Sequence, residues 1–522
     1  MKLRFGRILA AALAAGVPVA GCRLDYSSLF VSDGDFLATG RTSSFFRAVQ
    51  IDPRSEDSAG PHFVVHGDLD NNGLTDLVTG WNESQPIQIH LQQRDEAGEI
   101  RFETTTVGGT IPIAAMADIQ LADFDQDGWA DIAVMIKIRD LTDVGVAGPK
   151  PFDGAVMVFF SPADEDDLQN PLAWSEVLLG QSELAGFADG DGTTPDLGGY
   201  TDMEIGDIDL DGDLDIVAAF NWAIEDDTSS TATAEEAAQG RGRVEVFFNP
   251  DANGVSRARR GGEWSRYKSP TTSLLSLEAR QTTVKDVELV DIDCDNDLDV
   301  VVTRPAADSM NVRWIRNPVI RRQTEPAEWL SGVIGHIFTG ADTVEAGDLD
   351  QDGIPDVVVR STQGRVIQWF KGPKTPVIEP PRNLPWQVFT LAEFARRTPQ
   401  AIALGDLNGD GQLELIVAAG GAVVWFDALS APSVFDQWTE NLIIDDSARG
   451  QDVAIPTTDP NAAPIEVSGG TFINSILVVD LDGDGAVDFV ATLDRSGLSG
   501  LSNDALAWFE NTLGPTANQP AG

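Results

Sequence analysis

The sequence predicts an all-β protein, a seven-bladed β-propeller with four strands in each blade. Three observations predict it. An Asp-rich pattern recurs seven times, short strand-like runs flank each copy, and an N-terminal segment matches the one strand that the last unit lacks. A chain of 522 residues can form one such array because each repeat packs only on its neighbours.

The recurring pattern is D-x-D-x-D-G-x-x-D, and its copies begin at residues 68, 123, 207, 291, 348, 406 and 480. Its polar positions 1, 3, 5 and 9 are the candidate metal ligands. In chain order they are Asp68, Asp70, Asn72 and Asp76; Asp123, Asp125, Asp127 and Asp131; Asp207, Asp209, Asp211 and Asp215; Asp291, Asp293, Asp295 and Asp299; Asp348, Asp350, Asp352 and Asp356; Asp406, Asn408, Asp410 and Glu414; Asp480, Asp482, Asp484 and Asp488.

The flanks of the pattern predict four strands in each unit. An apolar run ends at the first Asp, and a β-branched run such as Val357–Val359 follows the last one. A third run carries paired aromatics, as in Trp369–Phe370, and a fourth begins at a Trp, as in Trp386–Leu391. Runs of four to six such residues beside Gly turns indicate strands. The Asp-rich loop then joins the first and second strands, a repeat typical of propeller blades.

The two ends of the repeat region predict how the ring closes. The seventh unit stops after its third strand, near residue 514, and residues 45–51 resemble the missing fourth strand. An N-terminal strand that closes the ring would remove two exposed sheet edges. We therefore assign residues 43–514 to the propeller and 515–522 to a flexible tail, and we expect the polar insertion at 225–242 to be mobile.

The loops predict up to seven Ca²⁺ ions. Calcium accepts six to eight oxygen ligands, which the acids and the backbone carbonyl at position 7 can supply. Gly at position 6 allows positive φ, and Asn296 replaces it in the fourth loop. The loops are not EF-hands, because position 12 is Val134 in the second copy instead of Glu. Weaker binding is expected in the first and sixth loops, where Asn72, Asn408 and Glu414 replace Asp.

An alternative is that these loops are Asp-rich turns satisfied by their own backbone. Several carboxylates within one small loop repel one another unless a cation neutralises them, which favours the calcium interpretation. The grouping of the acids on surface turns indicates a structural use of the ions instead of a catalytic one.

The N-terminus predicts export. Lys2, Arg4 and Arg7 precede an apolar stretch that ends in Val19-Ala20-Gly21-Cys22, which resembles a bacterial lipobox. We interpret residues 1–21 as a signal peptide, Cys22 as the lipidation site and residues 22–42 as a tether at the bacterial outer membrane or cell surface. A plain signal peptide with an incidental Cys is the alternative. With Cys22 lipidated, Cys294 has no disulfide partner.

The charge narrows the class of partner. The chain has 35 basic and 83 acidic residues, a net charge of −48. Such a surface repels nucleic acid and anionic lipid, so membrane contact is expected only through the lipid anchor.

The units resemble FG-GAP/VCBS repeats, which form integrin α-subunit propellers and many bacterial exported proteins; the resemblance covers residues 43–514. It implies a seven-bladed propeller with calcium in the loops. Family members serve mostly in adhesion and ligand binding, and a few similar propellers are polysaccharide lyases.

The function predicted is therefore a calcium-stabilised, non-catalytic binding or adhesion module for a protein or glycan ligand. The four histidines, His62, His66, His90 and His336, form no H-E-x-x-H motif and the chain has no G-x-S-x-G elbow. His62 and His66 are a possible ligand pair. The alternatives that stay open are a polysaccharide lyase on the same scaffold and a structural envelope component.

Overall fold

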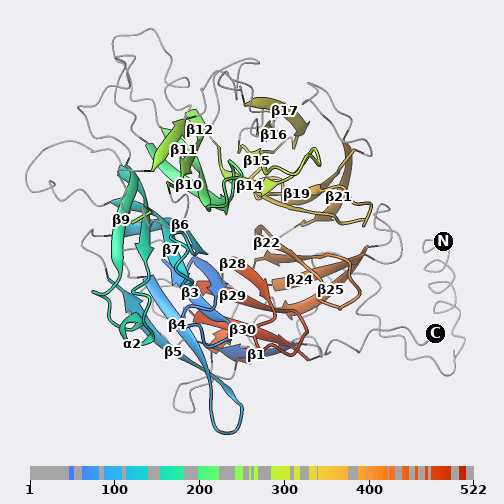
Figure 1. Cartoon of the computed structure of the whole chain (residues 1–522). Helices are drawn as coiled ribbons and strands as arrows, with labels where there is room; N and C mark the ends of the chain where they lie inside the picture. Colours follow the sequence, from blue (N-terminus) through green and yellow to red (C-terminus); the bar gives the residue numbers. More distant parts are fainter. Residues whose placement is uncertain are drawn as a thin grey trace, which may run out of the picture.

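The seven-bladed all-β propeller is confirmed in the computed structural model, in which seven four-stranded antiparallel sheets surround a common centre (Figure 1). The structure describes residues 46–51, 61–81, 87–108, 113–138, 153–181, 198–222, 241–250, 258–259, 264–268, 284–305, 311–317, 329–337, 339–373, 386–395, 397–420, 422–428, 438–445, 453–455, 465–467, 472–494 and 505–512. In these ranges the helical content is the single turn α2 (Glu165–Leu168). No helix among them has the length and apolarity that a membrane crossing requires.

Each blade is one sheet, and in blades 1 to 6 the strands follow the chain from the centre outward. Blades 1 to 4 contain β2 (Phe63–Gly67), β3 (Asp76–Gly80), β4 (Ile87–Arg94) and β5 (Ile100–Val107); β6 (Ile113–Ala122), β7 (Asp131–Ile138), β8 (Asp153–Phe160) and β9 (Ser175–Gln181); β10 (Gly198–Gly206), β11 (Asp215–Trp222), β12 (Arg241–Phe248) and β13 (Ser265–Lys268); β14 (Asp286–Val290), β15 (Asp299–Thr303), β16 (Val312–Arg316) and β17 (Leu330–Gly335).

Blades 5 and 6 repeat this order, and blade 7 combines both ends of the repeat region. Their strands are β18 (Thr343–Gly347), β19 (Asp356–Ser361), β20 (Val366–Lys371) and β21 (Gln387–Glu393); β22 (Pro399–Gly405), β23 (Glu414–Ala419), β24 (Ala422–Ala428) and β25 (Trp438–Asp445); β28 (Phe472–Val479), β29 (Asp488–Asp494), β30 (Ala505–Asn511) and β1 (Phe46–Gln50). A hairpin of β26 (Val453–Ile455) and β27 (Ile465–Val467), which the sequence did not predict, precedes blade 7.

Strand β1 pairs with β30 and supplies the fourth strand of blade 7. Phe46 lies opposite Asn511 and Gln50 opposite Ala507 in antiparallel register, and in Figure 1 the blue start of the described chain lies beside its red end. The innermost strands of neighbouring blades also contact one another around the whole ring, including β28 of blade 7 with β2 of blade 1. The first strands therefore line the centre of the propeller.

The hydrophobic core is divided into seven clusters, and each cluster lies between two neighbouring blades. The paired aromatics of the third strands explain this arrangement, since successive strand residues point to opposite faces. Trp369 packs between blades 5 and 6, whereas Phe370 packs between blades 4 and 5. The tryptophans before the fourth strands are also buried: Trp174, Trp264 and Trp386. Each lies in a cluster between two neighbouring blades, so these side chains serve blade packing.

The predicted signal peptide, Cys22, the tether at 22–42 and the tail at 515–522 lie outside the described residues. The insertion at 225–242, which was expected to be mobile, also lies outside the described residues, apart from the start of β12.

Candidate metal centres

Every Asp-rich loop lies between the first and second strands of its blade, as predicted. We number them loop 1 to loop 7 by blade; they span residues 68–76, 123–131, 207–215, 291–299, 348–356, 406–414 and 480–488. Position 6 has positive φ in all seven, from 70° at Asn296 to 98° at Gly212. Position 4 also has positive φ in all seven, from 55° to 72°, although it is Leu210 in loop 3 and Cys294 in loop 4. The sequence indicated only the first of these two left-handed positions.

Backbone N–H groups bind the acids in the same way in each loop. The carboxylate of position 1 accepts the N–H of position 6 in all seven loops, at 2.8–3.1 Å. The side-chain oxygen of position 5 accepts the N–H of position 7 in all seven, at 2.7–3.2 Å. These bonds pull the chain into a tight turn that brings the acids at positions 1 and 3 together. The third acid of the group is at position 5 in loops 2 and 4 and at position 9 in loops 1, 3 and 5.

The acid at position 9 begins the second strand and is buried in every blade. In loop 1, Asp76 Oδ2 accepts the Leu69 N–H at 2.7 Å and Asp76 Oδ1 accepts the Gln92 N–H at 2.6 Å. The same acid therefore fixes both the loop and the end of the third strand. Burial raises the pKa of these acids, against the opposing effect of the donated hydrogen bonds: to about 7 for Asp76, Asp356 and Asp488, about 8 for Asp131, Asp215 and Asp299, and about 9 for Glu414.

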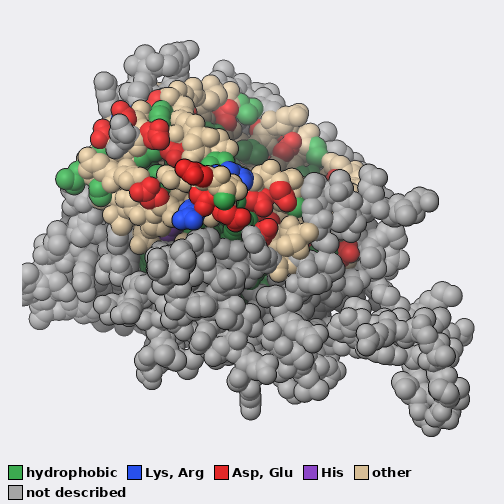
Figure 2. Space-filling model, turned by 90° about the horizontal axis from the view of Figure 1, so that it is seen from below, with side chains coloured by type: hydrophobic (Ala, Val, Ile, Leu, Met, Phe, Trp, Pro, Cys, Tyr) green, Lys and Arg blue, Asp and Glu red, His purple; other side chains and the backbone are tan. Residues whose placement is uncertain are grey.

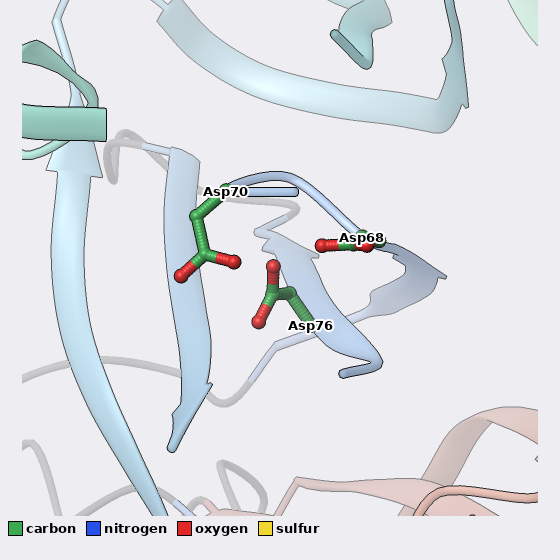
Figure 3. Close-up of side chains that lie close together, drawn as sticks. All are labelled: Asp68, Asp70 and Asp76. Atoms are coloured by element: carbon green, nitrogen blue, oxygen red, sulfur yellow. The ribbon is translucent and has the colours of Figure 1, made fainter. Parts of the chain in front are cut away.

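The acids converge as a hard cation requires. In loops 1 to 5, three carboxylates each offer an oxygen, and the three oxygens lie within 4.8 Å of one another. Figure 3 shows this for loop 1, where the carboxylates of Asp68, Asp70 and Asp76 turn toward a common point. Asp68 Oδ1 is buried and accepts no hydrogen bond from any described residue. A buried anionic oxygen without a donor is costly, so loop 1 fits a divalent cation.

Basic side chains of the protein contact the acids in three other loops. In loop 4, Arg316 lies 2.9 Å from Asp293 and 2.9 Å from Asp295. In loop 5, Lys371 contacts Asp350 and lies 2.9 Å from Asp352 Oδ2. Loop 2 is contacted from the neighbouring blade, by Arg259. Its guanidinium binds Asp125, Asp127 Oδ2 at 3.0 Å and the Ser161 carbonyl at 3.2 Å.

Hydrogen bonds between blades join the loops into one surface. The amide side chain at the end of a third strand donates to the position-2 carbonyl of the preceding loop, as in Asn249 to Phe124, Asn317 to Ile208 and Asn511 to Leu407. The position-4 side chains of loops 1, 2 and 5 donate to the position-6 carbonyl of the next loop. The conformation of one loop is therefore coupled by hydrogen bonds to that of the loop in the adjacent blade.

A second acidic site lies at the centre of the ring, in a cavity of about 260 Å³ lined by first strands. Three of its acids also join successive blades: Asp118 Oδ2 accepts the Met203 N–H, Asp202 Oδ2 the Val287 N–H and Asp286 Oδ2 the Val344 N–H, at 2.7–3.0 Å. The cavity is also lined by Glu204 on β10, Glu288 on β14 and Glu345 on β18. Acidic side chains also gather around a few basic ones on the described part of the side of the molecule seen in Figure 2.

Crowding makes these central acids hard to ionise. Burial raises the pKa of Asp118 to about 7 and that of Glu345 to about 8. Burial and then the charges of neighbouring acids raise the pKa values of Asp202, Glu204 and Glu288 well above their ordinary range. The sequence did not indicate this cluster, because its members are spread over first strands that read as apolar runs.

The histidines are not brought together as a ligand pair by any contact in the described residues. His62 lines the central cavity, whereas His66 is exposed on β2. His90 is fully buried between the hydroxyls of Thr79 and Thr104, each 2.9 Å away, and burial lowers its pKa to about 3.

Comparison with known proteins agrees with the repeat assignment. Residues 68–134, 291–359 and 348–417 match the family model described as an FG-GAP-like repeat. The protein is thus a seven-bladed β-propeller that contains FG-GAP-like repeats. Among solved structures, the rhamnogalacturonan lyase PL11 of Bacillus licheniformis aligns with a TM-score of 0.40 and 12% identity, over 90% of this chain and 76% of that chain. No curated protein sequence matches the chain.

Proposed function

We propose that the protein is a calcium-stabilised binding module that is exported and not catalytic. The calcium part is carried by loop 1, where three carboxylates converge and one buried oxygen of Asp68 has no hydrogen-bond donor among the described residues. The oxygens at positions 1, 3, 5 and 9, with the carbonyl at position 7, would hold the ion. Bound calcium would neutralise the loop and fix its turn.

The binding part is supported by a polar cavity on a rigid frame. Its acids sit on first strands that are fixed by hydrogen bonds to the next blade, so they cannot move independently. A cavity of about 260 Å³ suits one side chain or one sugar unit better than a larger ligand. Its acids favour a ligand that presents amino or hydroxyl donors.

Export and anchoring through Cys22 are part of the same proposal. The positive n-region and the lipobox-like Val19–Cys22 support it. Incorporation of a fatty-acid probe into the wild type but not into Cys22→Ser is the expected result, and equal labelling of both would contradict it.

Removal of calcium tests the metal part. Calcium that binds only the folded state raises stability by mass action. We expect a chelator to lower the melting temperature and millimolar calcium to restore it, while magnesium at the same concentration restores less. An identical melt in chelator and in calcium would refute calcium stabilisation.

A glycan array and an assay for unsaturated products from acidic polysaccharides, both in calcium, test the binding part against the lyase alternative. Binding on the array without new ultraviolet absorbance is the expected result. A calcium-dependent rise in absorbance would replace the proposal with the lyase. Silence in both assays would point to a protein ligand or to a structural envelope role.

A further inference from the structure

The strand position opposite the start of each second strand differs in charge from blade to blade. This position follows directly after the last paired residue of the third strand; in blade 5, for example, Val357 pairs with Phe370 and Lys371 comes next. It lies beside the Asp-rich loop. In blades 1 to 7 its occupants are Leu91, Phe160, Phe248, Arg316, Lys371, Asp427 and Glu510. The position is thus apolar in three blades, basic in two and acidic in two.

The two basic occupants bridge the acids that a metal would need. Arg316 spans positions 3 and 5 of loop 4, and Lys371 spans the same two positions of loop 5. Both cations are buried, at 5% and 7% exposure. A calcium ion at these acids would face a buried positive charge and would have to displace it, leaving that charge unpaired. The residues of loops 4 and 5 therefore do not fit calcium.

Loop 2 receives its cation by another route. Its own strand supplies Phe160, but Arg259 comes from the connection between β12 and β13 of blade 3 and lies over the Phe160 ring, 5.1 Å from its centroid. Arg259 contacts Asp125 and Asp127, which are again positions 3 and 5. A cation from the same blade in loops 4 and 5, and one from the next blade in loop 2, thus contacts the same two loop positions.

Loops 6 and 7 show the opposite charge. Asp427 and Glu510 add a carboxylate where blades 4 and 5 place a cation. Arg94 of blade 1 also reaches loop 7, but it donates to the backbone carbonyl of Asp482 and leaves that side chain available.

We propose that the loops differ in what neutralises their acids: in loops 2, 4 and 5 the protein's own Arg259, Arg316 and Lys371 replace calcium, and loops 1, 6 and 7 bind it. The inference rests on the calcium binding proposed above. It makes part of the ring independent of calcium supply. It also assigns the metal to the arc from blade 6 through blade 7 to blade 1.

Calcium stoichiometry tests this assignment. The full chain is dialysed against millimolar calcium, and bound metal is measured by atomic emission for the wild type, Arg316→Met and Lys371→Met. Four or fewer ions in the wild type, with one more in each Met variant, is the expected result. Lys371→Arg is the matched control and should not gain an ion. Asp427→Lys is the converse variant and should lose one.

The outcomes separate the two proposals. No bound calcium in the wild type would overturn both the calcium proposal and this inference. More than four ions in the wild type, or Met variants whose count does not rise, would overturn the inference while calcium stabilisation stands. If a Met variant folds only when calcium is present, its calcium-dependent melt supports the inference, because the metal then substitutes for the lost cation.

Discussion

At the scale of single residues, acids that look equivalent in the sequence of a loop make different contacts in the structure. Position 9 was predicted as a metal ligand, yet it also accepts two backbone N–H groups and joins the loop to the third strand. In blade 1 the partner in that second role is the N–H of Gln92 on β4, sixteen residues after Asp76. No local pattern could indicate it, since the contact exists only once the sheet has formed.

Asp76→Ala tests that structural role. The change leaves the Leu69 and Gln92 N–H groups buried without an acceptor, so we expect the free energy of unfolding to fall by about 2–4 kcal/mol even in chelator. Denaturant melts of both chains would measure it. The exposed Glu96→Ala is the control and should change stability by less than about 0.5 kcal/mol. A loss no larger than that of the control would show that Asp76 acts only through metal.

The built-in cations show why the basic side chains beside the loops were harder to predict than the acids within them. Lys371 and Arg316 end third strands, where they read as ordinary exposed basic residues, and Arg259 belongs to another blade. The fourth loop position is a similar case, because Leu210 and Cys294 carry no sequence signal for positive φ. Such features depend on contacts across blades.

At the scale of elements, the sequence predicted the strands well because each signal had a separate physical cause. The Asp loop marked the first turn of every blade, and paired aromatics marked third strands that pack on two neighbours. The hairpin β26–β27 was missed because its three-residue strands are shorter than any pattern that predicts a strand.

Strand β1 offers a test at this scale. Phe46 is 6% exposed and lies edge-to-face on Phe489, with 5.3 Å between ring centroids. Phe46→Ala should therefore lower the free energy of unfolding by about 3–5 kcal/mol.

A chain that begins at Asp52 lacks β1 altogether and should aggregate through the free edge of β30. A chain that begins at Ser44 retains β1 and should melt like the full propeller. Equal stability of the two shortened chains, measured with light scattering during the melt, would contradict a role for β1 in closing blade 7.

At the scale of the whole molecule, the central acids predict how stability depends on pH. Folding raises the pKa of Asp118 to about 7 and of Glu345 to about 8, so the folded state holds protons that the unfolded state releases near pH 4. Stability is then greatest below about pH 4 for these groups and is lost as the pH rises through 7 and 8. Between about pH 4 and its folded-state pKa, each of these carboxyls lowers stability by about 1.4 kcal/mol per pH unit, and the loss is complete above about pH 8.

Denaturant melts between pH 5 and pH 9 in saturating calcium would measure this dependence. Asp118→Asn with Glu345→Gln should make it less steep by the share of these two groups, since neither amide titrates and the amide oxygen introduced at position 118 can still accept the Met203 N–H. Arg360 and Lys285 oppose the effect by favouring the ionised form of Asp286. An unchanged slope in the double variant would exclude Asp118 and Glu345 as its source.

The pairing of β1 with β30 also has a consequence for how the protein is made. Strand β1, which contains Phe46, is synthesised early, but its partner residue Asn511 is synthesised near the end of the chain. Blades 1 to 6 can therefore form before β1 pairs with β30 in blade 7. Bringing together ends so far apart in the chain also carries the largest loop-closure entropy of any pairing in the fold. A product of interrupted synthesis that stops before Ala505 leaves β1 without a partner. The last blade can thus be completed only after translation has reached the end of the repeat array.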